Sequence, residues 1–170
     1  MTTIGTPKID TRPEQVYIGI RTVTPFSGMF KVVTQINKQL HRWLRDHQVT
    51  PAGPPFLRYN VIDMNGPMDI TFGVPVEAAM TEEGHVTVGK LLAGTYASLI
   101  YTGSGLAGNK ALIDWVRQNG LIFDRWPSEQ GDNFACRYEA FLTDPKVEPR
   151  KTRWEVEVAI KLQDAPRADG

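Results

Sequence analysis

Two glutamates in the last third of the chain, Glu139 and Glu157, are the side chains best suited to chemistry on a small molecule. Each lies in a run of alternating apolar and polar residues, so each is expected on one face of a β-strand. An ionised glutamate among apolar and aromatic side chains attracts lipophilic cations, because desolvated charge pairs are stronger than exposed ones. A glutamate whose pKa is raised can instead act as a general acid or base toward an electrophile and water. The pattern leaves open these two uses and the simpler role of a solvated charge.

Both acids belong to the second copy of an internal repeat. The repeated elements are Leu40-x-x-Trp43-x-Arg45 with Leu112-x-x-Trp115-x-Arg117, Arg58-Tyr59 with Arg137-Tyr138, and Tyr17 with Tyr96. Aligned through these repeats and the alternating run that ends each half, Glu139 lies opposite Asn60 and Glu157 opposite Thr71. A repeat that acquires acids in one copy predicts a pseudo-symmetric scaffold with an asymmetric site.

Aromatic residues near these acids are candidates for the walls of a binding site. The candidates are Tyr59, Tyr96, Trp126 and Phe141. Tyr59 and Tyr96 lie in predicted strands of the two halves, and Phe141 falls on the same strand face as Glu139. Trp126 lies in a loop flanked by charged residues, where it either caps the groove between the halves or packs on the second helix.

Other reactive residue types show no catalytic or metal-binding pattern. The three histidines lack the spacing of a metal site, and neither a metal nor a cofactor is expected. The single cysteine, Cys136, lies in an apolar run and is expected in the core. Residues 103–108 match the Gly-x-Gly-x-x-Gly spacing of dinucleotide sites, but the strand before them belongs to an antiparallel unit. We therefore expect Ser104 and its flanking glycines to form the loop that begins a helix.

The composition and charge of this chain of 170 residues limit the classes of partner that it can bind. It carries 19 basic and 19 acidic residues, so it lacks the excess of positive charge that attracts nucleic acid or a membrane surface. The N-terminus resembles no signal peptide, and no apolar stretch reaches transmembrane length. We expect a cytoplasmic protein with a small-molecule ligand and no direct contact with nucleic acid or membrane.

Each half of the chain predicts the order strand, helix, strand, strand. In the first half these are a strand over residues 15–24, a helix beginning at Met29, and strands over 56–64 and 68–76. In the second they are a strand over 95–102, a helix containing Leu112 and Trp115, and strands over 134–142 and 154–162. An extra strand over 86–92 joins the halves. Ser27 is the expected N-cap of the first helix.

These elements predict an α+β fold of two pseudo-symmetric modules with antiparallel sheets and a groove between them. Module one spans about 14–78 and module two about 94–163. Residues 1–164 are expected to form one domain, and 165–170 a flexible tail. If the last two strands form a hairpin, Glu139 and Glu157 are expected near each other on the face away from the helix.

The order of several short motifs resembles the gyrase-inhibitor-like (GyrI-like) small-molecule-binding domain, which is also the effector-binding part of AraC-type and MerR-type regulators. The motifs are Arg12-Pro13 before Val16-Tyr17, the helix ending in Trp43-Leu44, Gly73-Val74-Pro75-Val76, Ala93-Gly94-Thr95-Tyr96-Ala97, the Leu112/Trp115 helix, Tyr138-Glu139 with Asp144-Pro145, and Glu157-Val158-Ala159-Ile160. The resemblance covers about residues 10–163. It implies two strand-helix-strand-strand modules with a ligand groove between them.

The resemblance also implies a function. A glutamate on the penultimate strand contacts the ligand in this family, sometimes with a second acid on the last strand, and the matching residues are Glu139 and Glu157. No DNA-binding helix-turn-helix is expected in the chain, so it looks like the stand-alone form. Our leading hypothesis is that it binds amphipathic, aromatic or cationic, drug- or toxin-like small molecules in the groove between the modules. Some stand-alone members resemble hydrolases that open electrophilic natural products such as cyclopropane-bearing DNA alkylators. A third alternative is a protein-interaction role such as topoisomerase inhibition, with an unknown partner.

Overall fold

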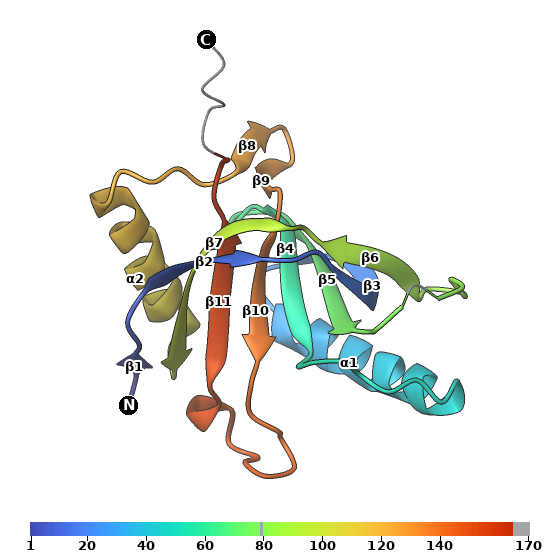
Figure 1. The fold of residues 1–170 in the computed structure, drawn as a ribbon. Coiled ribbons are helices and arrows are strands. Elements are labelled where there is room, and N and C mark those ends of the chain that lie inside the picture. Colours follow the sequence, from blue (N-terminus) through green and yellow to red (C-terminus); the bar gives the residue numbers. More distant parts are fainter. Residues whose placement is uncertain (79, 165–170) are drawn as a thin grey trace.

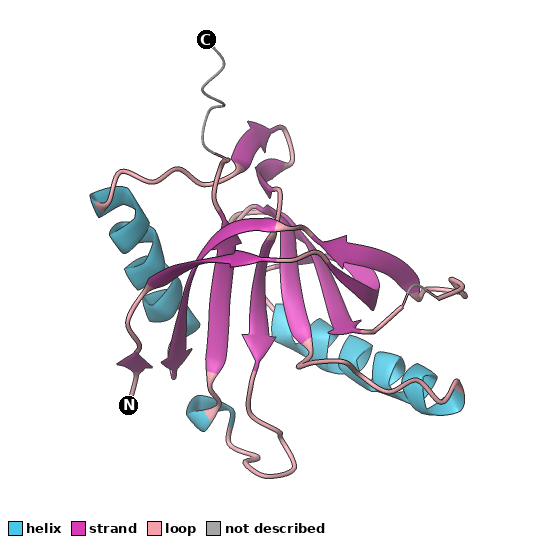
Figure 2. Cartoon of the chain, in the orientation of Figure 1, coloured by secondary structure: helices cyan, strands magenta, loops and turns pink. Residues whose placement is uncertain are grey.

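A computed structural model of the protein describes residues 1–78 and 80–164 as one large antiparallel β-sheet with two long helices (Figures 1 and 2). The strands are β1 (Thr3–Ile4), β2 (Lys8–Arg12), β3 (Gln15–Pro25), β4 (Phe56–Ile62), β5 (Pro67–Pro75), β6 (Thr87–Leu91), β7 (Gly94–Thr102), β8 (Arg125–Ser128), β9 (Gly131–Phe134), β10 (Arg137–Phe141) and β11 (Val156–Lys161). The helices are α1 (Met29–Asp46), α2 (Gly105–Gln118) and a 3-10 turn, η1 (Lys151–Arg153). The predicted α+β class is confirmed. The tail predicted for residues 165–170 lies outside the described residues.

The strand order places the predicted units side by side. Along the main path it reads β1-β7-β11-β10-β4-β5-β3-β6. Module two (β7, α2, β10, β11) therefore occupies one half of the sheet and module one (β3, α1, β4, β5) the other, in mirror order. The modules meet where β10 pairs with β4, with Glu139 opposite Leu57.

Both helices form because their apolar residues recur at steps of three and four, which turns one stripe toward the sheet. In α1 the buried stripe is Met29, Val33, Ile36, Leu40 and Leu44. The N-cap of α1 is Gly28, with a left-handed φ of 82°, and the expectation of Ser27 at this position was wrong. In α2 the Ser104 hydroxyl accepts a hydrogen bond from the Ala107 amide at 3.1 Å, so Ser104 begins this helix as expected.

The sheet is buried on both faces. One face packs against α1 over module one and against α2 over module two, which makes two apolar clusters. Phe141 contacts both of these clusters and so lies between the modules. The opposite face holds a third cluster, which includes Tyr17, Tyr96 and Tyr138. Figure 1 shows β2 and the beginning of β7 crossing in front of the central strands.

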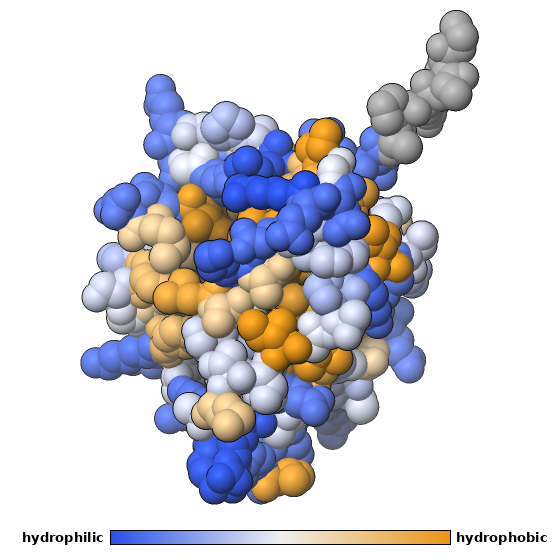
Figure 3. Space-filling model, turned by 90° about the vertical axis from the view of Figure 1, so that its left-hand side faces the viewer, coloured by the Kyte–Doolittle hydropathy of each residue, from blue (hydrophilic) through white to orange (hydrophobic). Residues whose placement is uncertain are grey.

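Apolar side chains are exposed on the face of the molecule that carries α2. Figure 3 shows apolar side chains gathered across the middle of the face that carries α2, beside a row of hydrophilic ones. Within α2, Leu106 is largely exposed. Neither α1 nor α2, the two long helices of the described residues, is long and apolar enough to span a membrane.

Candidate functional site

Glu139 lies on β10, where the two modules meet, with its side chain on the face that both helices cover. Its side chain is 8% exposed. The Tyr59 hydroxyl donates to Oε1 at 2.6 Å, and the Tyr101 hydroxyl donates to Oε2. Tyr59 comes from module one and Tyr101 from module two, so one carboxylate links the modules. Within the described part of the chain Glu139 forms no salt bridge.

The two tyrosines are held as proton donors. Burial, followed by the charge of Glu139 and the hydrogen bond to it, raises the pKa of Tyr59 well above its ordinary value. The same causes raise the pKa of Tyr101. Both hydroxyls therefore stay protonated at neutral and mildly alkaline pH, and both stabilise a negative charge on the carboxylate.

Two glycines of α2 make room for the Tyr101 ring. A Cβ at Gly108 would lie 2.5 Å from Cδ1 of Tyr101, and one at Gly105 would lie 3.1 Å from its hydroxyl. Close packing of α2 on this ring explains the second and third glycines of the Gly-x-Gly-x-x-Gly spacing, whereas Gly103 has a left-handed φ of 87° and lies against Thr2. Sequence reasoning missed Tyr101. Its signal was the period-two alternation of β7, which puts it on the strand face opposite to that of Tyr96.

Arg137 is the second functional side chain that sequence reasoning missed. It lies two residues before Glu139 on β10 and so on the same face. Its guanidinium lies 6.0 Å from the centroid of the Tyr59 ring and 4.7 Å from that of Phe134. One nitrogen, Nη2, donates to Oδ1 of Asn109 on α2 at 2.8 Å. Burial lowers the pKa of Arg137.

Aromatic rings continue from Glu139 toward the end of the β10–β11 hairpin. Phe141 stacks on Phe72 at 6.4 Å between ring centroids and meets Trp154 edge-on at 6.4 Å. Among the predicted site residues, Glu139, Tyr59 and Phe141 are therefore brought together on one face. The result is a buried acid with aromatic neighbours, an arrangement that suits an aromatic or cationic group.

Glu157 and Tyr96 lie on the opposite face of the sheet, and the expectation that Glu139 and Glu157 lie near each other on one face was wrong. The hairpin itself is present, but Glu157 pairs with Ala140 and Glu139 with Val158. Glu157 accepts a hydrogen bond from Arg12 at 2.9 Å. Tyr96 is 1% exposed and packs in the third cluster. The expectation failed because each strand was assumed to turn its apolar side toward the helices, whereas this sheet has an apolar core on both faces.

The strand registers also change the alignment of the two repeats that was read from the sequence. We take Tyr17 and Tyr96 as equivalent residues of the two modules and follow the strand pairing from each. In module one Tyr17 pairs with Pro75, and Gly73, two residues earlier on β5, pairs with Phe56 of β4. In module two Tyr96 pairs with Lys161, and Ala159, two residues earlier on β11, pairs with Tyr138 of β10. Phe56 of β4 is therefore equivalent to Tyr138 of β10, which gives an offset of 82 residues between the two strands (138 − 56). Glu139 then corresponds to Leu57, not to Asn60. The acid therefore stands where the other module keeps a buried leucine.

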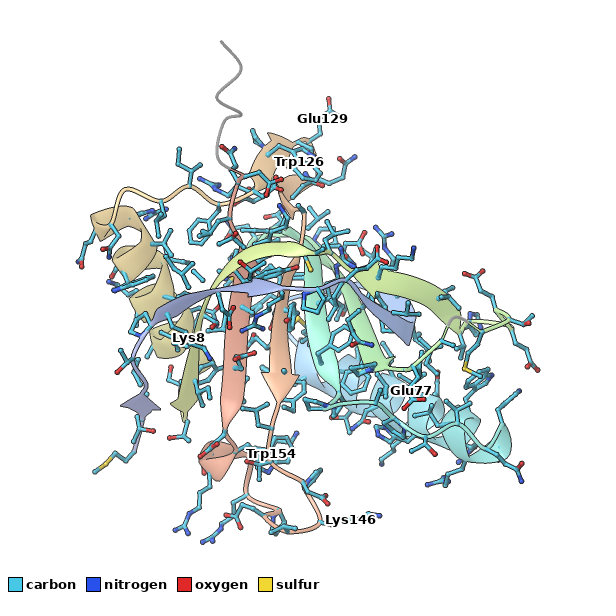
Figure 4. The ribbon with its side chains drawn as sticks, in the orientation of Figure 1. Lys8, Glu77, Trp126, Glu129, Lys146 and Trp154 are labelled. Carbon is cyan, nitrogen blue, oxygen red and sulfur yellow. The ribbon has the colours of Figure 1, made fainter. Side chains whose placement is uncertain are left out.

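Trp126 lies in the β8–β9 hairpin. It is in β8, it is 50% exposed, and Figure 4 shows it at the end of the molecule opposite to Trp154. It is thus separated from Trp154, which packs on Phe141.

Two hollows lie outside the immediate surroundings of Glu139. A cavity of about 70 Å³ lies beside Arg137, between α2 and the β8–β9 hairpin. An open depression of about 580 Å³ lies at the C-terminal end of α1 and is bordered by Lys146. The larger hollow is lined by His41 and the two cations Arg45 and Lys146, with neither an acid nor a Phe, Tyr or Trp ring among its lining residues, so it does not suit an aromatic cation. Within residues 1–78 and 80–164, no group of three or more His, Cys, Asp or Glu side chains could hold a metal ion.

Comparisons with known proteins show the fold. No protein-family model matches the sequence, and no curated protein matches it. The C-terminal domain of EcmrR is similar in structure, with a TM-score of 0.71 and 18% identity over 95% of this chain and 99% of that domain. The EcmrR chain in the EcmrR–DNA complex is similar to 94% of this chain, with a TM-score of 0.73 and 18% identity. This chain spans 58% of the length of that EcmrR chain.

Two further structures share the fold at lower identity. A hydrolase from Listeria innocua has a TM-score of 0.59 and 10% identity, covering 92% of this chain and 91% of its own. SAV2435 bound to tetraphenylphosphonium has a TM-score of 0.56 and 8% identity, covering 93% of this chain and 94% of its own. The chain thus shares its fold with the EcmrR C-terminal domain and with these two proteins.

Proposed function

We propose that this protein is a GyrI-like domain that binds amphipathic, aromatic or cationic small molecules between its two modules, with Glu139 as the main polar anchor. The observation that carries the proposal is the Glu139 carboxylate. It is almost fully buried at the module junction, held by two tyrosine hydroxyls and without a salt bridge among the described residues. Burying such a charge costs several kcal/mol unless it is compensated. Because Leu57 fills the corresponding place in module one, packing alone does not require an acid there.

The similar structures support the ligand class. SAV2435 shares the fold and is bound to tetraphenylphosphonium, a lipophilic aromatic cation. Here Tyr59 donates to the buried acid, Phe141 follows it on the same face of β10, and Trp154 meets the Phe141 ring edge-on. Aromatic faces attract cations. Glu157 and Tyr96 are not part of this proposal, because they lie on the other face of the sheet.

Binding of tetraphenylphosphonium measured by titration calorimetry tests the proposal. Glu139→Gln should weaken binding about 10- to 100-fold, because interactions of a charged group are worth roughly 1.5–3 kcal/mol. Glu155→Gln is the matched control, since Glu155 is an exposed acid on the neighbouring segment. Equal affinities of the two variants would contradict the role of Glu139.

Hydrolysis of an electrophilic, drug-like compound at the same place is the second candidate. It is favoured by the buried carboxylate, which can activate water, and by the two tyrosine hydroxyls beside it, which can donate hydrogen bonds. Mass spectrometry after incubation with electrophilic aromatics would detect a product one water heavier. Glu139→Gln should abolish that product and spare binding of the substrate. If every compound is recovered unchanged, hydrolysis is contradicted and only the binding function remains.

A further inference from the structure

Arg137 occupies the position that a cationic ligand would take. Its guanidinium lies over the same Tyr59 ring whose hydroxyl donates to Glu139, at 6.0 Å from the ring centroid. A cation near the face of an aromatic ring and close to a carboxylate is attracted electrostatically by both groups. In this structure the protein's own arginine holds that place, so an incoming cation meets a like charge.

The guanidinium is incompletely bonded where it lies. Its Nε is buried without a hydrogen-bond partner, and within the residues described Arg137 forms no salt bridge. The hydrogen bond that it donates goes to the neutral amide of Asn109. An arginine usually makes several hydrogen bonds through its planar group. Arg137 is therefore held mainly by two rings and one amide, which leaves it free to exchange for a better partner.

A better partner lies beside it. The cavity of about 70 Å³ is lined by Arg137 and by Asp132 of β9. Oδ2 of Asp132 accepts a hydrogen bond from Arg125 at 2.7 Å, but its Oδ1 is buried without a partner. The same small cavity thus brings together an arginine that lacks partners and a carboxylate oxygen that lacks a donor.

We propose that Arg137 is a resident cation that the ligand replaces: an aromatic cation takes the face of the Tyr59 ring, and the Arg137 guanidinium rotates into the adjoining cavity and donates to Oδ1 of Asp132. This inference rests on the proposed function, because it assumes that ligands bind at Glu139. It makes Arg137 the residue that sets the charge selectivity of the site.

The test compares tetraphenylphosphonium with the neutral triphenylphosphine oxide. Arg137→Gln should tighten binding of the cation about 10-fold or more, because a like charge a few ångströms from the ligand is removed, and should change binding of the neutral compound less than about 3-fold. Arg117→Gln is the matched control, since Arg117 lines the same cavity without lying over Tyr59. If Arg137→Gln does not fold, Arg137→Met keeps the apolar stem and serves the same comparison.

A double-mutant cycle tests the movement itself. Asp132→Asn should weaken binding of the cation about 3- to 10-fold in the wild-type background and less than about 2-fold in the Arg137→Gln background, where no arginine needs a new partner. Equal effects in both backgrounds would overturn the movement to Asp132. Unchanged or weaker binding by Arg137→Gln, or equal tightening by Arg117→Gln, would overturn the resident cation.

The outcomes also separate this inference from the proposed function. If Glu139→Gln weakens binding of the cation but Arg137→Gln does not strengthen it, the inference fails and the proposed function stands. If neither the wild type nor any variant binds the two compounds, both fail.

Discussion

Replacing Tyr101 with phenylalanine removes one of the two hydroxyls that hold the Glu139 carboxylate and leaves the ring in place. Tyr101 is 5% exposed, so water does not easily replace the lost donor. A hydrogen bond to a charged group contributes roughly 1.5–3 kcal/mol. We expect Tyr101→Phe to lower the free energy of unfolding by that amount, which is about 3–12 °C in Tm for a domain of this size.

Urea denaturation followed by circular dichroism would measure this cost. Tyr96→Phe is the matched control, because Tyr96 is also buried but donates to a neutral acceptor, the Leu92 carbonyl, at 2.7 Å. Its loss should cost only about 0.5–1.5 kcal/mol. If Tyr101→Phe costs no more than Tyr96→Phe, the hydroxyl does not hold a charged carboxylate.

A second background makes the test stricter. Glu139→Leu copies the residue at the corresponding place in module one and takes away the acceptor. In that background a phenylalanine at position 101 should be neutral or stabilising, because a buried hydroxyl without an acceptor is itself unfavourable. A cost that stays the same in both backgrounds would show that Tyr101 stabilises the fold independently of Glu139.

Three further changes test other parts of the structure. Gly108→Ala should destabilise the protein by about 1–2 kcal/mol in thermal denaturation despite the better helix propensity of alanine, because its Cβ would crowd the Tyr101 ring; a more stable variant would contradict that packing. Glu157→Gln should cost about 1–2 kcal/mol, because it removes one of the two carboxylates that pair with Arg12, the other being Asp10. Binding of tetraphenylphosphonium should stay unchanged, and weaker binding would show that Glu157 contributes to the ligand site. Hydrogen bonds to the Trp43 carbonyl and to Glu83 raise the pKa of His47, so its stabilising effect should be complete below the ordinary histidine pKa and disappear as pH rises through the raised value. An NMR titration of His47 with a midpoint at or below the ordinary pKa would refute this.

The helices and the main strands could be predicted because each carries its own periodic pattern. The stripe of α1 and the alternation of β11 are local, and the structure confirms both elements. Strands β1, β2, β8 and β9 were not predicted. β1 has only two residues, too few to show a periodic pattern. β2 is stabilised by pairing with β7, a contact distant in sequence, and β8 and β9 contain proline, glycine and charged residues that weaken the strand pattern.

The site could be predicted only in part, for a related reason. Glu139, Tyr59 and Phe141 share a face because the alternation of β10 and the pairing of β10 with β4 bring them together. Which face of the sheet they share depends on the register between strands, and no single strand encodes that register. Glu157 was misplaced for this reason. Tyr101 and Arg137 were missed because their roles arise from contacts with α2 and Tyr59 that form only in the folded chain.

A crystal structure of the protein with tetraphenylphosphonium tests the central claim most directly. We predict ligand density between the modules, next to the Glu139 carboxylate and against the Tyr59 ring, with no ligand in crystals of Glu139→Gln at the same concentration. Density in the open depression at the end of α1, or ligand at the module junction equally in both proteins, would contradict the claim that Glu139 is the anchor.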